Sequence, residues 1–163
     1  SHCERSKALA ALGRVDEALY LARAVVRQCT HASLGDLLVV AALESCGRLW
    51  QAQTEVMEGL QRRPHDPSLR VAYARLLARR GKLDEAEAAL VDLQQQWPGD
   101  EVAARALGGI RAARILKDEG NGHYQRGEHE RAAASYTEAL QVDPEKCMAP
   151  ILLGNRAQAR LLG

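Results

Sequence analysis

The stretch "RGKLDEAEAALVDL", residues 80–93, decides the fold because its layout recurs along the chain. The same layout appears in "LGRVDEALYLARAV", residues 12–25, and in "CGRLWQAQTEVMEG", residues 46–59. Gly13, Gly47 and Gly81 are each 34 residues apart. An aliphatic residue follows each of them after two positions and an alanine after five, and "RGEHERAAASY", residues 126–136, keeps the alanine. A constant spacing of this length indicates one structural unit repeated in tandem.

Each unit has the pattern helix, glycine turn, helix. The segments upstream of two of the glycines, "GDLLVVAALESC" at 35–46 and "PSLRVAYARLLARR" at 67–80, have apolar residues at helical spacing. Proline ends the second helix of a unit, because Pro64, Pro98 and Pro144 each lie 17 residues after a turn glycine. A new helix is then expected to begin with an aspartate cap and a proline at its first position, at 66–67 and again at 143–144.

This 34-residue unit resembles the tetratricopeptide repeat, with glycine at the turn, alanine five residues later and proline at its end. The resemblance covers nearly the whole chain. It implies an all-α fold of about nine helices stacked into a right-handed superhelix. Composition agrees, because Phe is absent, only two Trp are present, and hydrophobic residues make up 47% of the sequence.

The period breaks between Gly81 and Gly127, which are 46 residues apart. The extra residues carry a broad apolar stripe, so we predict one elongated helix from about Asp100 to about Arg126. Gly108-Gly109 is either a bend in this helix or a place where a neighbour packs closely. Two regions are therefore predicted: three repeats over 1–99, the first truncated, and the elongated helix with a repeat and the first helix of a further, truncated one over 100–163.

Total charge and motifs exclude several classes of function. The net charge is +1, so no long-range field attracts nucleic acid or an anionic membrane. No apolar run approaches the roughly 20 residues that span a bilayer. The sequence has no phosphate-binding glycine loop, no histidines at metal-ligand spacing and no set of nucleophile, base and orienting group. We predict a protein that is not an enzyme and that uses no cofactor and no metal.

Cysteine usage indicates the compartment. Cys3, Cys29, Cys46 and Cys147 are far apart in the sequence and show no Cys-x-x-Cys motif. Helix faces are expected around them, where cysteine packs as a small apolar residue. The prediction is a reduced, cytoplasmic protein, with the nucleus as a second compartment.

One helix face carries an ammonium and a carboxamide, since Lys117 and Asn121 are four residues apart. Asn155 lies one period, 34 residues, after Asn121 and is followed by Arg156. Three such side chains could converge on one carboxylate, which accepts charge-assisted hydrogen bonds from ammonium and amide N–H groups. Without further context, a lysine and an asparagine on one helix face are usually solvated surface.

This set, in the context "LKDEGNGHYQRGEHERAAASYTEALQVDP" followed by "LLGNRAQA", is similar to the carboxylate-clamp repeats of tetratricopeptide co-chaperones. The resemblance implies that Lys117, Asn121 and Asn155 bind the acidic C-terminal tail of heat-shock protein 70 or heat-shock protein 90 in the concave groove. Tyr124 would cover an apolar side chain of that peptide. Arg75 and Arg79 are further candidates for groove contacts, with ordinary exposed charge as the commoner role for such a pair.

The succession of repeats, elongated helix and clamp repeat is similar to that of J-domain co-chaperones with tandem repeat arrays. The resemblance implies a longer array, a J domain outside this stretch, a further repeat with two more basic clamp residues, and possible client binding by the first three units. Exposed apolar faces at the two ends would favour self-association. The alternative function is a scaffold that binds internal peptides or domains of another complex without a carboxylate clamp.

Overall fold

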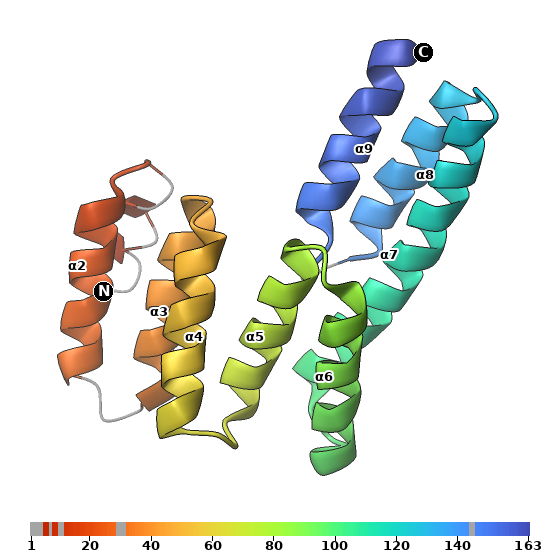
Figure 1. Ribbon diagram of the computed structural model, residues 1–163. Coiled ribbons are helices and arrows are strands. Elements are labelled where there is room, and N and C mark those ends of the chain that lie inside the picture. The colour runs from red at the N-terminus through yellow and green to blue at the C-terminus, as the bar shows by residue number, and fades with distance from the viewer. Residues whose placement is uncertain (1–4, 7, 10–11, 29–31, 144–145) are drawn as a thin grey trace. The chain divides into compact units, whose positions relative to one another are not determined.

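The computed structural model describes residues 5–6, 8–9, 12–28, 32–143 and 146–163, and within them every regular element is a helix. Figure 1 shows these helices in chain order. Their bounds are α2 Val15–Gln28, α3 Ala32–Ser45, α4 Leu49–Arg62, α5 Pro67–Arg79, α6 Leu83–Gln96, α7 Glu101–Gln125, α8 His129–Gln141 and α9 Ala149–Leu162. The predicted all-α fold of paired helices is confirmed.

The turn within each unit depends on its glycine. All four turn glycines have a left-handed backbone, and their φ angles lie between 70° and 85°: Gly13, Gly47, Gly81 and Gly127. A side chain is strained in this conformation, whereas glycine adopts it at no steric cost. The backbone N–H of each following residue then bonds back to the preceding helix, as Lys82 does to the carbonyl of Leu77 at 2.9 Å. The glycine spacing therefore marks the helix pairs correctly.

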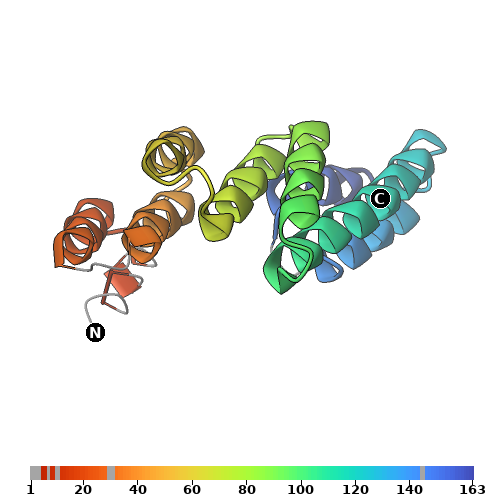
Figure 2. The same cartoon turned by 90° about the horizontal axis from the view of Figure 1, so that it is seen from below.

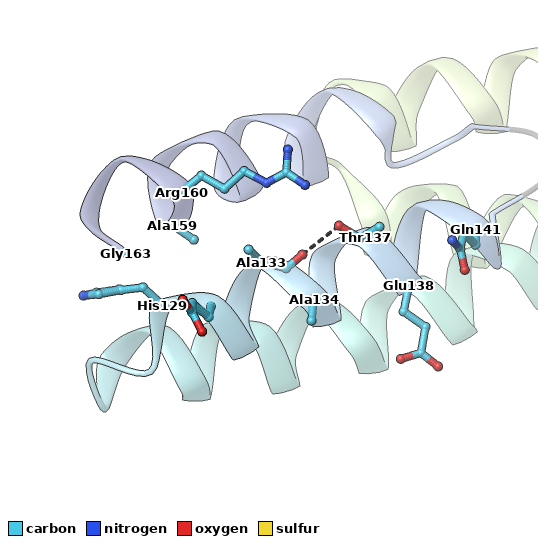
Figure 3. A pocket seen from close by; sticks show the side chains of 10 residues that line it. His129, Ala133, Ala134, Thr137, Glu138, Gln141, Ala159, Arg160 and Gly163 are labelled. Atoms are coloured by element: carbon cyan, nitrogen blue, oxygen red, sulfur yellow. Dashed lines mark hydrogen bonds between the residues drawn. The ribbon is translucent and has the colours of Figure 1, made fainter.

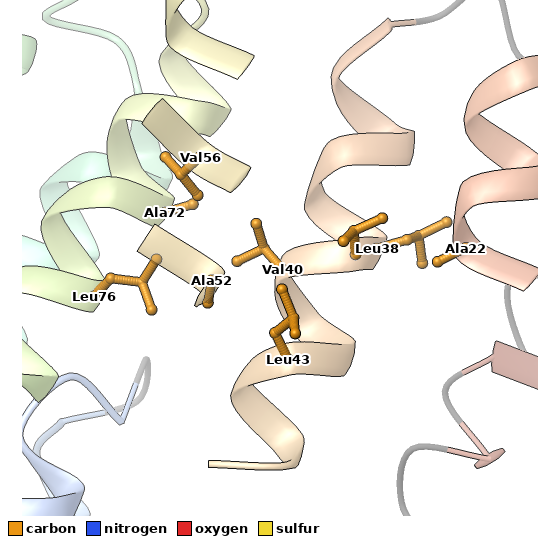
Figure 4. Close-up of a cluster of buried hydrophobic side chains, with 9 residues drawn as sticks. Ala22, Leu38, Val40, Leu43, Ala52, Val56, Ala72 and Leu76 are labelled. Atoms are coloured by element: carbon orange, nitrogen blue, oxygen red, sulfur yellow. The ribbon is translucent and has the colours of Figure 1, made fainter. Parts of the chain in front are cut away.

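The alanine five residues after each glycine lies in the core between packed helices. Ala18, Ala52, Ala86 and Ala132 are all fully buried. Ala52 belongs to a cluster that α2, α3, α4 and α5 build together. Figure 4 shows Ala22 beside Leu38 on one side of α3, and Val40 on the other side, directed toward α4 and α5. A methyl group lets two helix backbones approach closely, and a larger side chain would hold them apart.

The elongated helix is present, as α7, with 25 residues. Its first turn is capped by Asp100, whose side chain accepts a hydrogen bond from the Ala103 N–H at 2.8 Å. The helix continues without interruption through Gly108-Gly109; Gly109 is buried, while Gly108 is exposed. It packs against α6 near its start and against α8 near its end, and Figures 1 and 2 both show α8 running alongside α7.

The chain divides into two compact units, residues 1–76 and residues 77–163, with the boundary inside α5. The division of the repeats at residues 99 and 100 stays a prediction. Of the cysteines within the described residues, Cys46 and Cys147 are not joined in a disulfide bond, while Cys3 and Cys29 lie outside those residues. No described helix is both long and apolar enough to cross a membrane.

One predicted helix start is confirmed and the other is wrong. Asp66 caps α5 by accepting a hydrogen bond from the Leu69 N–H at 3.1 Å, and Pro67 is the first helical residue. Asp143 does not begin a helix, because α9 starts only at Ala149. Its buried carboxylate instead accepts the backbone N–H of Met148 at 2.7 Å and closes the expanded turn between α8 and α9. Pro144 lies outside the described residues.

Candidate functional site

The second unit brings the two candidate asparagines together. Asn121 lies near the end of α7 and Asn155 in the middle of α9, 34 positions further along the chain. The Nδ2 of Asn155 donates to the Oδ1 of Asn121 at 3.4 Å. Lys117 lies one helical turn before Asn121 on α7. Two asparagines that are one repeat apart in the sequence are thus neighbours in space, and both side chains are half-buried.

Tyr136 completes this polar group, and the sequence pattern did not single it out. Its hydroxyl donates to the same Oδ1 of Asn121 at 2.8 Å. Asn121 therefore accepts two hydrogen bonds on one oxygen. Tyr136 shares the buried face of α8 with Ala132 and Ala139, four residues before and three after it. A tyrosine at that spacing is typical of a core position, which is why periodicity alone does not reveal its polar role.

Gly120 makes room for the Tyr136 ring. An added Cβ at Gly120 would lie 2.6 Å from Cε1 and 2.9 Å from Cδ1 of the ring. The ring therefore packs directly on the backbone of α7. Burial raises the pKa of the Tyr136 phenol, the Tyr124 phenol raises it further, and a hydrogen bond with Asn155 lowers it only in part. Tyr136 stays protonated at neutral pH and remains a hydrogen-bond donor.

Lys117 is largely enclosed by protein, with 19% of its side chain exposed. Its ammonium lies 3.0 Å from the Oδ1 of Asp118, whose side chain is 62% exposed. An exposed carboxylate of this kind is a weak partner, since solvent competes for it. A cation held in a sheltered position by a weak partner can still bind an incoming anion by exchanging one carboxylate for another.

Tyr124 lies in the last turn of α7, next to the turn that leads to α8. Its ring contacts the ring of His129 edge to face, with centroids 5.2 Å apart. At the same turn, His123 Nδ1 contacts the carboxylate of Glu128. This contact, followed by hydrogen bonding from Arg126, lowers the pKa of Glu128. Tyr124 is half-buried, so part of its surface is accessible to solvent.

The arginines of α5 do not form one exposed pair. In the first unit Arg75 makes two hydrogen bonds to Glu44, from Nε at 3.2 Å and from Nη2 at 2.8 Å. The Glu44 side chain is 8% exposed, so this pair is largely desolvated. Ordinary exposed charge is therefore the wrong description of Arg75. Arg79 is half-buried one turn further along the same helix.

A separate groove of about 630 Å³ lies between α8 and α9. Figure 3 shows its lining, with Ala133, Ala134 and Ala159 on the walls and Arg160 above them. The one hydrogen bond drawn there runs from the Thr137 hydroxyl to the Ala133 carbonyl, at 2.8 Å. Lys117, Asn121 and Asn155 do not line this groove, so it is not the candidate carboxylate site.

No group of three histidine, cysteine or carboxylate side chains that could hold a metal ion occurs in the ranges that the structure describes. The second unit instead gathers a sheltered ammonium, two linked carboxamides and a buried phenol. Ammonium and carboxamide groups can donate hydrogen bonds to anionic or polar groups.

Comparison with known proteins agrees with the repeat fold. Two sequence models, each described as tetratricopeptide repeat, match residues 40–110 and residues 113–146, which together make up more than half of the chain. The second match ends in the turn that Asp143 closes and contains both Lys117 and Asn121. A search of curated proteins finds no match. Tetratricopeptide repeats are protein-protein interaction modules, and from its helix pairs, its turn glycines and these two matches the chain belongs to the tetratricopeptide repeat family.

Proposed function

We propose that the second unit binds the C-terminal carboxylate of an acidic peptide through Lys117, Asn121 and Asn155. The observation that carries the proposal is the hydrogen bond between Asn121 and Asn155, which joins two helices of successive repeats at one point. Lys117 supplies a positive charge one turn away from that point. A terminal carboxylate offers two oxygens, and an ammonium and an amide N–H are suited to one each.

Within this proposal the partners are heat-shock proteins 70 and 90, whose tails end in the acidic sequence Glu-Glu-Val-Asp. The support is the residue pattern itself, which resembles the clamp repeats of co-chaperones and, in the order of its elements, DnaJ homolog subfamily C member 7. The protein would act as a cytoplasmic adaptor, or a nuclear one. Tyr124, whose ring contacts that of His129 edge to face, would pack against the valine side chain of the tail.

A scaffold that binds internal peptides or domains is the second candidate, and one contact in the second unit favours it. Lys117 is already paired with Asp118. A cation that the protein itself neutralises has less to gain from a free carboxylate. Such a site would bind neutral or mixed-charge segments, and amidation of the peptide C-terminus would not matter.

The test is an amide-resolved NMR titration with the peptide Met-Glu-Glu-Val-Asp, run beside the same peptide with an amidated C-terminus. Shifts around Lys117, Asn121 and Asn155 with the free acid alone support the proposal. Equal binding of both peptides refutes it and favours the scaffold. Lys117→Ala should weaken binding of the acid form about tenfold, the order of one charge-assisted hydrogen bond.

Lys82→Ala is the matched control for that substitution. Lys82 is an exposed lysine that also pairs with a nearby carboxylate, that of Glu85, at 2.9 Å, but it belongs to the turn before α6. Its replacement should leave the dissociation constant unchanged. Both variants should melt within a few degrees of the parent protein, because each lysine pairs with a carboxylate that is more than half exposed, and such a pair contributes about 1 kcal/mol or less. A large loss of stability in Lys117→Ala alone would mean that the lysine is structural.

A further inference from the structure

Tyr136 is the one member of the polar group that lies on α8, whereas Asn121 is on α7 and Asn155 on α9. It is almost fully buried, with 2% of its surface exposed, so its hydroxyl cannot itself be the main contact of a ligand. Its hydrogen bond to Asn121 is the shortest in the group, at 2.8 Å. The buried phenol of Tyr136 therefore acts on Asn121 through this hydrogen bond.

An asparagine side chain has one oxygen that accepts and one NH₂ group that donates two hydrogen bonds. The Oδ1 of Asn121 is occupied by the Tyr136 hydroxyl and by the Nδ2 of Asn155. Neither N–H of Asn121 has a hydrogen-bond partner within the part of the chain that the structure describes. Both therefore remain free to donate to a ligand, whereas the oxygen already accepts two hydrogen bonds from the protein.

The opposite orientation of the amide would present Oδ1 to the ligand. A carboxylate would then meet a carbonyl oxygen, and neither group has a proton to share. The buried hydroxyl of Tyr136 would also lose its acceptor, which costs the desolvation of a polar group inside the protein. The phenol thus favours the orientation of the Asn121 carboxamide in which Oδ1 accepts the Tyr136 hydroxyl, and it disfavours the flipped orientation.

We propose that Tyr136 is a positioning residue that fixes the Asn121 carboxamide with its NH₂ group toward the ligand, so that the site accepts an anion and rejects a hydrogen-bond donor. This inference rests on the proposed carboxylate site and explains its selectivity. It also assigns a purpose to Gly120, since only the absence of a side chain there lets the Tyr136 ring lie against α7. Gly120 and Tyr136 act on the ligand only through Asn121.

The variant Tyr136→Phe removes the hydroxyl and keeps the ring. We expect the affinity for the free-acid peptide Met-Glu-Glu-Val-Asp to fall about tenfold, while the affinity for the amidated peptide stays the same or rises. The selectivity between the two peptides therefore collapses. In the protein without peptide, the ¹⁵N and ¹H shifts of the Asn121 side-chain NH₂ group should move, because its orientation is no longer fixed.

Tyr73→Phe, at a half-buried tyrosine of the first unit, is the matched control and should change none of these readouts. If Tyr136→Phe leaves both the peptide selectivity and the Asn121 NH₂ shifts as they are in the parent, the inference is wrong and the carboxylate site stands. If the parent itself binds acid and amide alike, the proposed function fails. Movement of the NH₂ shifts together with lost selectivity supports the inference, and a loss of melting temperature alone would overturn it in favour of a structural role.

Discussion

Replacing Gly120 by alanine adds one methyl group where the Tyr136 ring already lies. The new Cβ would be 2.6, 2.9 and 3.1 Å from three ring carbons. The ring is almost fully buried and held by its hydrogen bond to Asn121, so it cannot swing aside as a flexible side chain would. Helices α7 and α8 must therefore separate at this point. Gly108 on the same helix offers the comparison, because a Cβ there meets nothing within 4 Å.

Both Gly108→Ala and Gly120→Ala gain helix propensity, but only Gly120→Ala overpacks a buried contact. Alanine is favoured over glycine inside a helix by about 1 kcal/mol. Overpacking a buried contact costs about 1–3 kcal/mol. Gly108→Ala should therefore raise the free energy of unfolding by about 1 kcal/mol. Gly120→Ala should lower it by about 1 kcal/mol, which is the overpacking cost of about 2 kcal/mol less the same helix gain.

Urea unfolding followed by circular dichroism measures both variants, and the difference between them, about 2 kcal/mol, is the quantity of interest. A third variant locates the effect: in a Tyr136→Leu background the ring is gone, and Gly120→Ala should then gain stability as Gly108→Ala does. If Gly120→Ala is as stable as Gly108→Ala in the parent background, the ring does not pack on the helix as described, and the account of Asn121 loses its support.

Two further predictions concern packing and pH. Ala86→Leu should lower the free energy of unfolding by about 1–3 kcal/mol, because Ala86 is fully buried. Ala88→Leu, on the exposed face of the same helix, should change that free energy little. Equal urea midpoints for the two variants would mean that the repeat register is misplaced. The raised pKa of Tyr136 leaves stability unaffected below about pH 10, and above it the unfolded chain releases its proton first, so stability falls. Alkaline unfolding should show that fall in the parent protein and a smaller one in Tyr136→Phe; identical curves would contradict it.

Local features of the sequence were sufficient to predict the repeat. A left-handed turn strongly favours glycine for local steric reasons, and a buried alanine recurs at the same place in each helix pair. The elongated helix was predictable for the same reason, since its apolar stripe and its cap at Asp100 are properties of one continuous segment. Spacing also placed Lys117 and Asn121 on one face of that helix.

The tertiary structure decided what those side chains contact. Asn121 meets Tyr136, 15 positions away, and Asn155, 34 positions away, and Arg75 meets Glu44 across 31 positions. Asp143 looked like a helix cap, yet it closes a turn that is longer than in the other units. Helix propensity and turn chemistry act over a few residues, so the sequence by itself determined the helices and their order. Contacts between successive repeats depend on how side chains of different helices pack, and only the folded chain brings Tyr136 to Asn121.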